Sequence, residues 1–185
     1  VLPVRPRQQG SGGGAGVQAV IAREAQLTDV AVIRAIALAA WPVAYSAILS
    51  PGQLAYMLEL MYSETALKEQ MGSKGHRFLL LDNEAGRSIG FAGFEHRYAN
   101  RTSTRLHKLY LLPDAKGAGN GTALLNWVEQ AARAVGDARI ELNVNRFNPS
   151  KDWYKGRGFR IERDEVIDIG HGYVMDDHVM VKDLR

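Results

Sequence analysis

The stretch that decides the fold reads Leu109-Tyr110-Leu111-Leu112-Pro113-Asp114-Ala115-Lys116-Gly117-Ala118-Gly119-Asn120-Gly121-Thr122-Ala123-Leu124-Leu125. Its apolar start, which stops at a proline, predicts a strand, and its alternating glycines predict a turn that opens a helix. Glycine tolerates positive φ and lets a ligand approach the backbone closely. Free N–H groups at a helix N-terminus bind anions, and Lys116 adds a positive charge beside them. The stretch therefore predicts a strand, an anion-binding turn and a helix in direct succession.

The spacing of the glycines separates three kinds of phosphate site. A Walker loop requires Gly-x-x-x-x-Gly-Lys-Ser/Thr, an order that is missing here. A dinucleotide fingerprint requires Gly-x-Gly-x-x-Gly, whereas the chain has Gly117-x-Gly119-x-Gly121. The order that remains is a basic residue, alternating glycines and a helix. Taken alone, this order also fits an ordinary strand-to-helix turn.

A second segment, Asn145-Arg146-Phe147-Asn148-Pro149-Ser150-Lys151-Asp152-Trp153-Tyr154-Lys155-Gly156-Arg157-Gly158-Phe159, combines an asparagine, an aromatic–tyrosine pair and Gly-Phe. With the glycine turn, it resembles the GNAT superfamily of acyl-CoA-dependent N-acyltransferases, whose basic Gly-x-Gly loop holds the pyrophosphate of coenzyme A. Other parts of the chain are similar to a bacterial subgroup that includes small polyamine acetyltransferases. Asn120, where an aliphatic residue is usual, departs from the pattern. So does Gly156, which should weaken its helix by up to about 1 kcal/mol.

The resemblance implies one α+β domain over residues 17–185, after a flexible glycine-rich tail over residues 1–16. It implies a mixed, mostly antiparallel central sheet flanked by helices. The strand over residues 140–144 should splay from the strand before the glycine turn and admit the pantetheine arm. Hydrophobic periodicity predicts the order strand, three helices, three strands, helix, strand, helix and two strands.

Local signals place the ends of several predicted elements. Ser50 and Ser63 are predicted helix caps, and Thr28 is predicted to cap the first helix. Pro42 is predicted to end or kink that helix. The polar residues 100–105 are predicted to form a loop.

The resemblance also implies acetyl-CoA as the co-substrate, with no metal. The residues expected to bind it are Leu111, Leu112, Lys116, Gly117, Ala118, Gly119, Asn120, Gly121, Thr122 and Asn148. Asn148 fits a second role equally well, because it could cap the helix that follows Pro149.

Acylation of an amine by a thioester requires an acceptor for the amine proton, donors for the oxyanion and a proton for the departing thiolate. Tyr154 occupies the family's tyrosine position, and a phenol is a suitable proton donor to a thiolate. Glu95 and His107 are candidates for the general base, and His96 is an alternative. Side chains alternate along a strand, so Glu95 and His96 should not face the same cleft. Each could instead be a solvated strand residue.

The first helices carry aromatic residues that the resemblance places over the acceptor pocket. Trp41 and Tyr45 are the candidates for this pocket, although packing between helix and sheet explains such residues equally well. The segment Asp176-Asp177-His178 contains metal-ligating residue types, but no recognised ligand spacing accompanies it.

Composition narrows the classes of function. The 185 residues contain no cysteine, which excludes a disulfide framework, thiolate metal sites and a cysteine nucleophile. The net charge of +3 is too small to indicate nucleic acid. No purely apolar run reaches the roughly 18–20 residues that span a bilayer, so a membrane partner is not expected. The expected protein is a cytoplasmic N-acetyltransferase for a small-molecule or peptide amine, with homodimer formation left open. The alternative is a non-catalytic acyl-CoA-binding module.

Overall fold

The computed structural model describes residues 19–185, and the predicted tail over residues 1–16 lies outside the described residues. In chain order the elements are β1 (Val20–Glu24), α1 (Val30–Tyr45), α2 (Pro51–Tyr62), α3 (Glu64–Met71), β2 (Arg77–Asn83), β3 (Ser88–Glu95), β4 (Ser103–Leu111), α4 (Asn120–Ala134), β5 (Arg139–Asn145), α5 (Ser150–Lys155), β6 (Arg160–Gly170) and β7 (Tyr173–Asp183). This order confirms the predicted sequence of elements.

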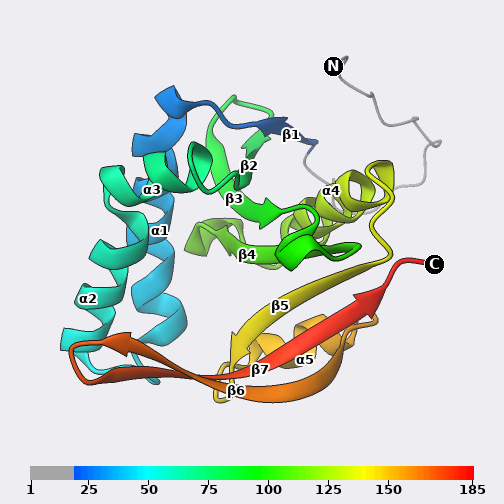
Figure 1. The fold of residues 1–185 in the computed structure, drawn as a ribbon. Helices are drawn as coiled ribbons and strands as arrows, with labels where there is room; N and C mark the ends of the chain where they lie inside the picture. The colour runs from blue at the N-terminus through cyan, green and yellow to red at the C-terminus, as the bar shows by residue number, and fades with distance from the viewer. Residues whose placement is uncertain (1–18) are drawn as a thin grey trace.

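The strands form one sheet in the order β1-β2-β3-β4-β5-β7-β6. All neighbouring strands run antiparallel except β4 and β5, which are parallel. Helices α1, α2 and α3 lie together on one side of the sheet, and α4 lies on the other (Figure 1). The sheet therefore has the mixed, mostly antiparallel character that the sequence predicts.

Two apolar cores, one on each side of the sheet, hold these layers together. One core joins α4 to the sheet through residues such as Leu124, Leu125 and Val128. The other joins α1, α2 and α3 to the sheet through residues such as Ile33 and Trp41. Burying each large apolar side chain contributes about 1.5–3 kcal/mol, so both faces of the sheet stabilise the domain.

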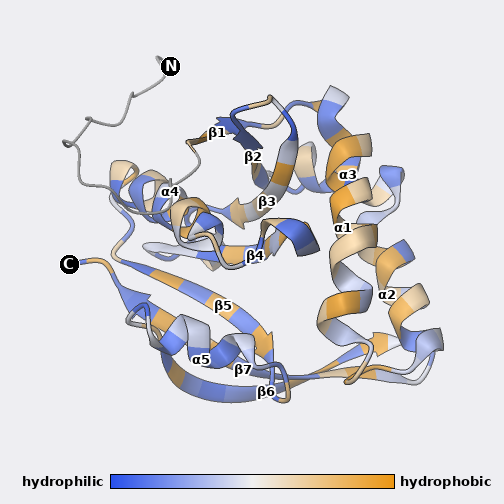
Figure 2. Cartoon of the chain, turned by 180° about the vertical axis from the view of Figure 1, so that it is seen from behind, coloured by the Kyte–Doolittle hydropathy of each residue, from blue (hydrophilic) through white to orange (hydrophobic). Residues whose placement is uncertain are grey.

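Helix α1 is the most apolar helix of the domain. The segment Leu27–Tyr45 is long and apolar enough to cross a membrane by length and composition alone. In this fold Ile33, Ala37 and Trp41 are buried against the sheet, which gives the apolar face of α1 a structural role. Figure 2 shows α1 as largely hydrophobic, whereas β6 at the sheet edge is mostly hydrophilic.

Both ends of α1 differ from the prediction. Thr28 was expected to cap the helix, but it lies inside a 3₁₀ turn that precedes α1. The capping carboxylate is that of Asp29, which accepts a hydrogen bond from the Gln26 N–H at 2.8 Å. Pro42 was expected to end or kink the helix near Trp41, yet α1 continues to Tyr45. Proline removes one backbone donor only, and the core contacts of Tyr45 hold the last turn in place.

The caps of α2 and α3 confirm the prediction. Ser50 Oγ accepts a hydrogen bond from the Gln53 N–H at 3.2 Å, with Pro51 at the first helical position. Ser63 Oγ accepts from the Ala66 N–H at 3.3 Å. Both caps satisfy backbone donors that have no partner inside the helix.

The loop predicted for residues 100–105 is shorter than expected, because β4 already begins at Ser103. Ser103 pairs with Arg139 of β5, and the buried Thr104 hydroxyl donates a hydrogen bond to Asp137 Oδ2 at 2.7 Å. Polarity suggested a loop, but the backbone pairing of Ser103 and the hydrogen bond of Thr104 let both residues be buried, although the Ser103 hydroxyl has no hydrogen-bond partner among residues 19–185.

The sheet opens between β4 and β5. The two strands pair only from Ser103 with Arg139 to Leu106 with Leu142. On the other edge of β4, Gly93 pairs with Lys108 and Phe94 with Leu106, so His107 is the extra residue of a β-bulge. A bulge bends its strand and increases the local twist. Beyond it, β4 stays on β3 while β5 continues along β7, which confirms the predicted splay.

Candidate active site

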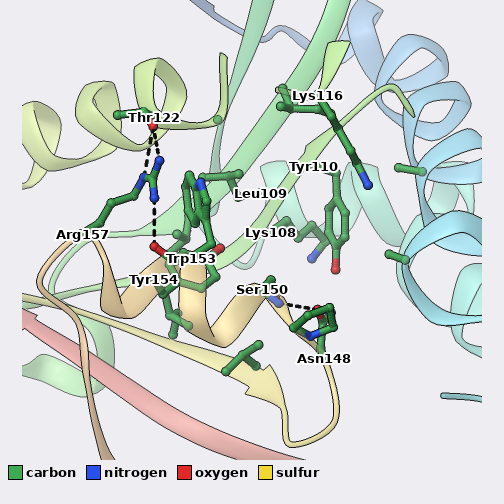
Figure 3. Close-up of a pocket in the computed structure, with 18 of the residues that line it drawn as sticks. Lys108, Leu109, Tyr110, Lys116, Thr122, Asn148, Ser150, Trp153, Tyr154 and Arg157 are labelled. Carbon is green, nitrogen blue, oxygen red and sulfur yellow. Dashed lines mark hydrogen bonds between the residues drawn. The ribbon is translucent and has the colours of Figure 1, made fainter. Parts of the chain in front are cut away.

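A cavity of about 590 Å³ lies where β4 and β5 separate. Its wall combines residues of α1, β4, the glycine turn, α4, β5 and α5 (Figure 3). Many of the residues singled out in the sequence meet here. They are Tyr45, His107, Leu111, Lys116, Gly117, Gly119, Gly121, Thr122, Asn148 and Tyr154.

The glycine turn presents its backbone to this cavity. Gly117 and Gly119 have φ angles of +86° and +79°, a backbone conformation that residues other than glycine rarely adopt. A Cβ atom built on either glycine would have no neighbour within 4 Å among the described residues, so the backbone faces open space. Helix α4 begins at Asn120, and the first N–H groups of a helix have no intrahelical partner. The turn is therefore suited to a diphosphate group.

The third glycine serves packing. A Cβ atom on Gly121 would lie 3.2 Å from Trp153 Cζ2, which is tighter than an ordinary contact. Gly121 thus lets α5 approach the N-terminus of α4 closely. Asn120 also has a structural role, because its buried side-chain amide donates to the Ala115 carbonyl at 2.9 Å. This bond ties the loop to the helix and explains the departure from an aliphatic residue.

Arg157 lines the cavity, although sequence reasoning did not select it. Its guanidinium donates two hydrogen bonds to Thr122 Oγ1, at 3.0 and 2.6 Å, and one to the Trp153 carbonyl at 2.9 Å. It also stacks 3.8 Å from the centroid of the Trp153 ring. Arg157 therefore joins α5 to α4 and places a second cation, with Lys116, on the wall near the turn. In the sequence, its position between Gly156 and Gly158 was the feature that could have drawn attention to Arg157.

Three of the residues expected to bind the co-substrate are not among the residues that line this cavity. Within residues 19–185, the cavity wall does not include Leu112, Ala118 or Asn120. The Leu112 N–H donates to the Ile89 carbonyl at 2.8 Å and so continues the sheet toward the turn.

Tyr154 lines the cavity from α5. Its ring lies edge-on to Trp153 at 4.9 Å and to Phe159 at 5.4 Å between centroids, and both contacts fix its orientation. Burial, with the nearby Tyr45, raises the pKa of Tyr154 above its usual value of 10.0. The phenol therefore keeps its proton at neutral pH and can donate it.

Asn148 lines the cavity and also organises the start of α5. Its Oδ1 accepts a hydrogen bond from the Ser150 N–H at 2.9 Å (Figure 3). This Asx turn orders the chain just before α5, which resembles the helix-capping role that the sequence suggested as an alternative for Asn148. The side-chain N–H₂ group remains a donor for a ligand.

Glu95 and His107 form a pair at the bulge. His107 Nε2 lies 3.1 Å from Glu95 Oε2, and only His107 belongs to the cavity wall. Burial and the neighbouring cations lower the pKa of His107 to about 2. Burial raises the pKa of Glu95. The alternative His96 faces elsewhere, with Nδ1 2.9 Å from Thr104 Oγ1, as strand alternation predicts.

His76 completes a cluster with this pair. Its Nε2 lies 3.7 Å from Glu95 Oε2, and its ring stacks on that of His107 with 4.1 Å between centroids and 11° between planes. Potential ligand atoms of the three residues lie within 4.8 Å of one another. The lone pair of an imidazole nitrogen lies in the plane of its ring, and the planes of these two rings are nearly parallel and stacked. Their lone pairs therefore do not converge on one tetrahedral or octahedral metal position.

The segment Asp176-Asp177-His178 also contains metal-ligating residue types, but its side chains make separate contacts. His178 Nδ1 lies 2.6 Å from Asp164 Oδ1, and Asp176 pairs with Arg146 at 2.9 Å. Asp177 is buried, which raises its pKa to about 6.

The two pocket candidates on α1 have different surroundings. Tyr45 lines the cavity, and its hydroxyl lies 3.0 Å from that of Tyr110. Trp41 is buried in the core and donates from Nε1 to the Tyr62 hydroxyl at 3.2 Å. Lys108, which sequence reasoning did not select, is buried on β4 and contributes to the cavity wall.

Comparison with known proteins gives two results. Residues 49–175 match the sequence model of the family described as "Acetyltransferase (GNAT) domain". No match is found among curated proteins.

Solved structures of similar fold include several acetyltransferases. The PaiA N-acetyltransferase of Thermoplasma acidophilum, solved with coenzyme A, has 23% identity and a TM-score of 0.74 over 89% of this chain and 99% of that one. A GCN5-related N-acetyltransferase of Rhodopseudomonas palustris has 20% identity and a TM-score of 0.76 over 94% and 99%. The spermidine/spermine N-acetyltransferase SpeG of Vibrio cholerae has 16% identity and a TM-score of 0.64 over 89% and 94%.

Proposed function

Because the chain belongs to the GNAT acetyltransferase family, we propose that it transfers an acetyl group from acetyl-CoA to a primary amine within one ternary complex. The observation that carries this proposal is the shared cavity. The glycine turn, the Tyr154 hydroxyl and the His107 ring all reach it where β4 and β5 separate. Anion binding and proton transfer are thus available at one site.

The glycine turn is proposed to hold the diphosphate of acetyl-CoA. The N–H groups at the start of α4 would donate to the phosphate oxygens, and Lys116 and Arg157 would add positive charge. The edge of β4 that no longer pairs with β5 has backbone groups free for the pantetheine amides, beginning beyond Leu106. Asn148 would donate from its side-chain amide.

Acetyl-CoA supplies an activated thioester, and the acceptor nitrogen forms the new bond to its acetyl carbon as the carbon–sulfur bond breaks. Tyr154 is proposed to donate a hydrogen bond, and then its proton, to the departing sulfur; the phenol is protonated at neutral pH, and its raised pKa makes it a weaker acid than an ordinary tyrosine. The products are the N-acetyl amine and the free thiol of coenzyme A. The chain has no cysteine to carry the acetyl group, which favours direct attack by the amine.

Glu95 and His107 are proposed to receive the amine proton. With Nε2 directed at Glu95, the Nδ1 atom of His107 is the acceptor that remains. The lowered pKa of His107 disfavours a lasting imidazolium, so Glu95 should take the Nε2 proton as Nδ1 accepts one. Glu95 is partly exposed, which allows water to remove that proton.

The test is acceptor-dependent release of thiol from acetyl-CoA over a panel of spermidine, amino acids and peptides. The expected result is release that rises with one class of amine, together with an acetylated product seen by mass spectrometry. Binding of acetyl-CoA without release for any amine would contradict the proposal and favour a non-catalytic acyl-CoA-binding module.

A further inference from the structure

Lys108 is a buried cation without a partner. Its relative exposure is 8%, and within residues 19–185 its Nζ makes no hydrogen bond or ion pair. The side chain crosses β3 at Gly93, where an added Cβ would lie 3.4 Å from Lys108 Cδ. Its Nζ lies 5.6 Å from the ring centroid of Tyr62 and 6.0 Å from that of Phe78. Ring faces stabilise the charge, but they do not satisfy three N–H donors.

The charges around the cavity are unevenly distributed. No aspartate or glutamate belongs to the part of the wall formed by residues 19–185. Lys116 and Arg157 lie at the glycine turn and at the end of α5, where the proposed function assigns them to phosphate. Lys108 lies on β4 beside Tyr110 (Figure 3). It is therefore a cation of the cavity for which acetyl-CoA provides no evident partner.

The surroundings of Lys108 affect its protonation. Burial, together with the nearby cation Lys74, lowers the pKa of Lys108 to about 8. The side chain is still mainly protonated at pH 7. The Lys108 ammonium has no protein partner among residues 19–185, and an anion bound in the cavity would supply one.

Given the proposed function, we infer that the acceptor amine also carries a carboxylate and that Lys108 binds this group. A carboxylate offers acceptors to the Lys108 ammonium, and the hydrogen-bonded pair of Tyr45 and Tyr110 hydroxyls on the same wall leaves one further O–H donor. A polyamine would instead bring additional positive charge to a wall whose residues within 19–185 include no carboxylate, Glu95 lying behind His107. The substrate class is thus an amino acid or a related amino carboxylate, and Lys108 determines specificity.

The experiment compares each amino acid with its amide, and kcat/KM is calculated on the concentration of neutral amine, because loss of the carboxylate also lowers the pKa of the amine. Leucine is paired with leucinamide, and 4-aminobutyrate is paired with 4-aminobutyramide. The two pairs differ in the distance between the amine and the carboxylate, so they also show which distance the site accepts. For at least one pair, the acid should have a kcat/KM that is roughly 10- to 100-fold that of its amide. In Lys108→Met this ratio should fall to near one.

Two further variants serve as controls. Lys74→Met removes a positive charge from a neighbouring lysine that is 57% exposed, and it should preserve the acid-to-amide ratio. Lys108→Gln provides a second neutral side chain if the methionine variant melts at a much lower temperature. A wild-type ratio of one or less in both pairs would overturn the inference. An unchanged ratio in a folded Lys108 variant would do so as well.

A binding measurement keeps this inference separate from the proposed function. If no amine supports thiol release, the proposed transfer fails, and the affinity of N-acetylleucine in the presence of coenzyme A is measured by calorimetry. Lys108→Met should weaken that affinity by about 10-fold or more. Absence of binding to the wild type, or equal affinity in both proteins, would overturn the assignment of Lys108.

Discussion

The hydroxyl oxygens of Tyr45 and Tyr110 lie 3.0 Å apart and join the end of α1 to β4 at the cavity wall. Burial raises the pKa of both phenols, so both stay neutral and one donates to the other. This hydrogen bond links the helical layer to the strand that carries Lys108 and His107. It therefore positions the part of the cavity wall that is proposed to bind the acceptor.

A double-mutant cycle tests this bond. Tyr45→Phe and Tyr110→Phe should each lower the free energy of unfolding by about 1 kcal/mol, because each leaves the other hydroxyl without that partner. The double variant should lose little more than either single variant. Urea denaturation of the four proteins measures the coupling, and strictly additive losses would show that the bond contributes nothing.

Tyr154→Phe separates proton donation from binding. The variant should lower kcat by roughly 10²–10⁴-fold, since a phenyl ring retains the packing against Trp153 and Phe159 but has no proton to give. The dissociation constant for acetyl-CoA should stay within about threefold. Steady-state kinetics and calorimetry give the two values.

A matched control for this variant is Tyr56→Phe. The Tyr56 hydroxyl donates to the Ile169 carbonyl at 2.7 Å, and Tyr56 is not part of the cavity wall formed by residues 19–185. This variant should lose stability more than kcat. Equal turnover in Tyr154→Phe and the wild type would remove Tyr154 from its proposed role.

Gly119→Val should abolish acetyl-CoA binding. The φ of +79° already strains a β-branched residue, and the new side chain would fill the open space in front of the turn. Gly86→Val is the control, because Gly86 has a φ of +74° and an equally open surrounding but lies in the β2–β3 turn. Both variants should lose similar stability, and only Gly119→Val should lose affinity in a calorimetric titration. Normal affinity in both would exclude the turn as the phosphate site.

His76 makes stability depend on pH. Burial, with Lys108 and Lys74 nearby, lowers its pKa from 6.5 to about 4 in the folded protein. The unfolded chain therefore binds more protons between these values, and stability present above pH 6.5 is lost as the pH falls toward 4. Between pH 7 and pH 5 this group should account for a loss of about 2 kcal/mol.

The variant His76→Gln isolates that contribution. The raised pKa values of Glu95 and Asp177 act in the opposite direction, since they favour the folded state as the pH falls. Both carboxyl groups are present in both proteins, so the comparison subtracts them. Urea denaturation at pH 7 and pH 5 should show a loss for the variant that is smaller by about 2 kcal/mol. The same loss in both proteins would rule out His76 as its source.

Local chemistry explains what the sequence predicted well. Ser50 and Ser63 cap their helices because the partner N–H lies three residues ahead in the chain. The turn at Gly117 and Gly119 follows from backbone conformations that glycine adopts at no steric cost. The order of elements follows from the period of the apolar residues, which the chain carries in itself.

Tertiary contacts explain what the sequence predicted poorly. Helix α1 passes Pro42 because core packing outweighs one missing hydrogen bond. Strand β4 starts early because its backbone pairs with β5 and Asp137 accepts a hydrogen bond from the Thr104 hydroxyl. A local pattern contains neither partner.

The site shows the same division. The sequence alone located the glycine turn and Tyr154, since both lie in contiguous motifs. Only the folded chain brings Glu95 to His107 and leaves the Lys108 side chain buried without a partner among residues 19–185. Burial and pairing depend on residues that are distant in the chain, so the tertiary structure decided which charges the cavity contains. On that basis the proposed acceptor changes from any primary amine to one that carries a carboxylate.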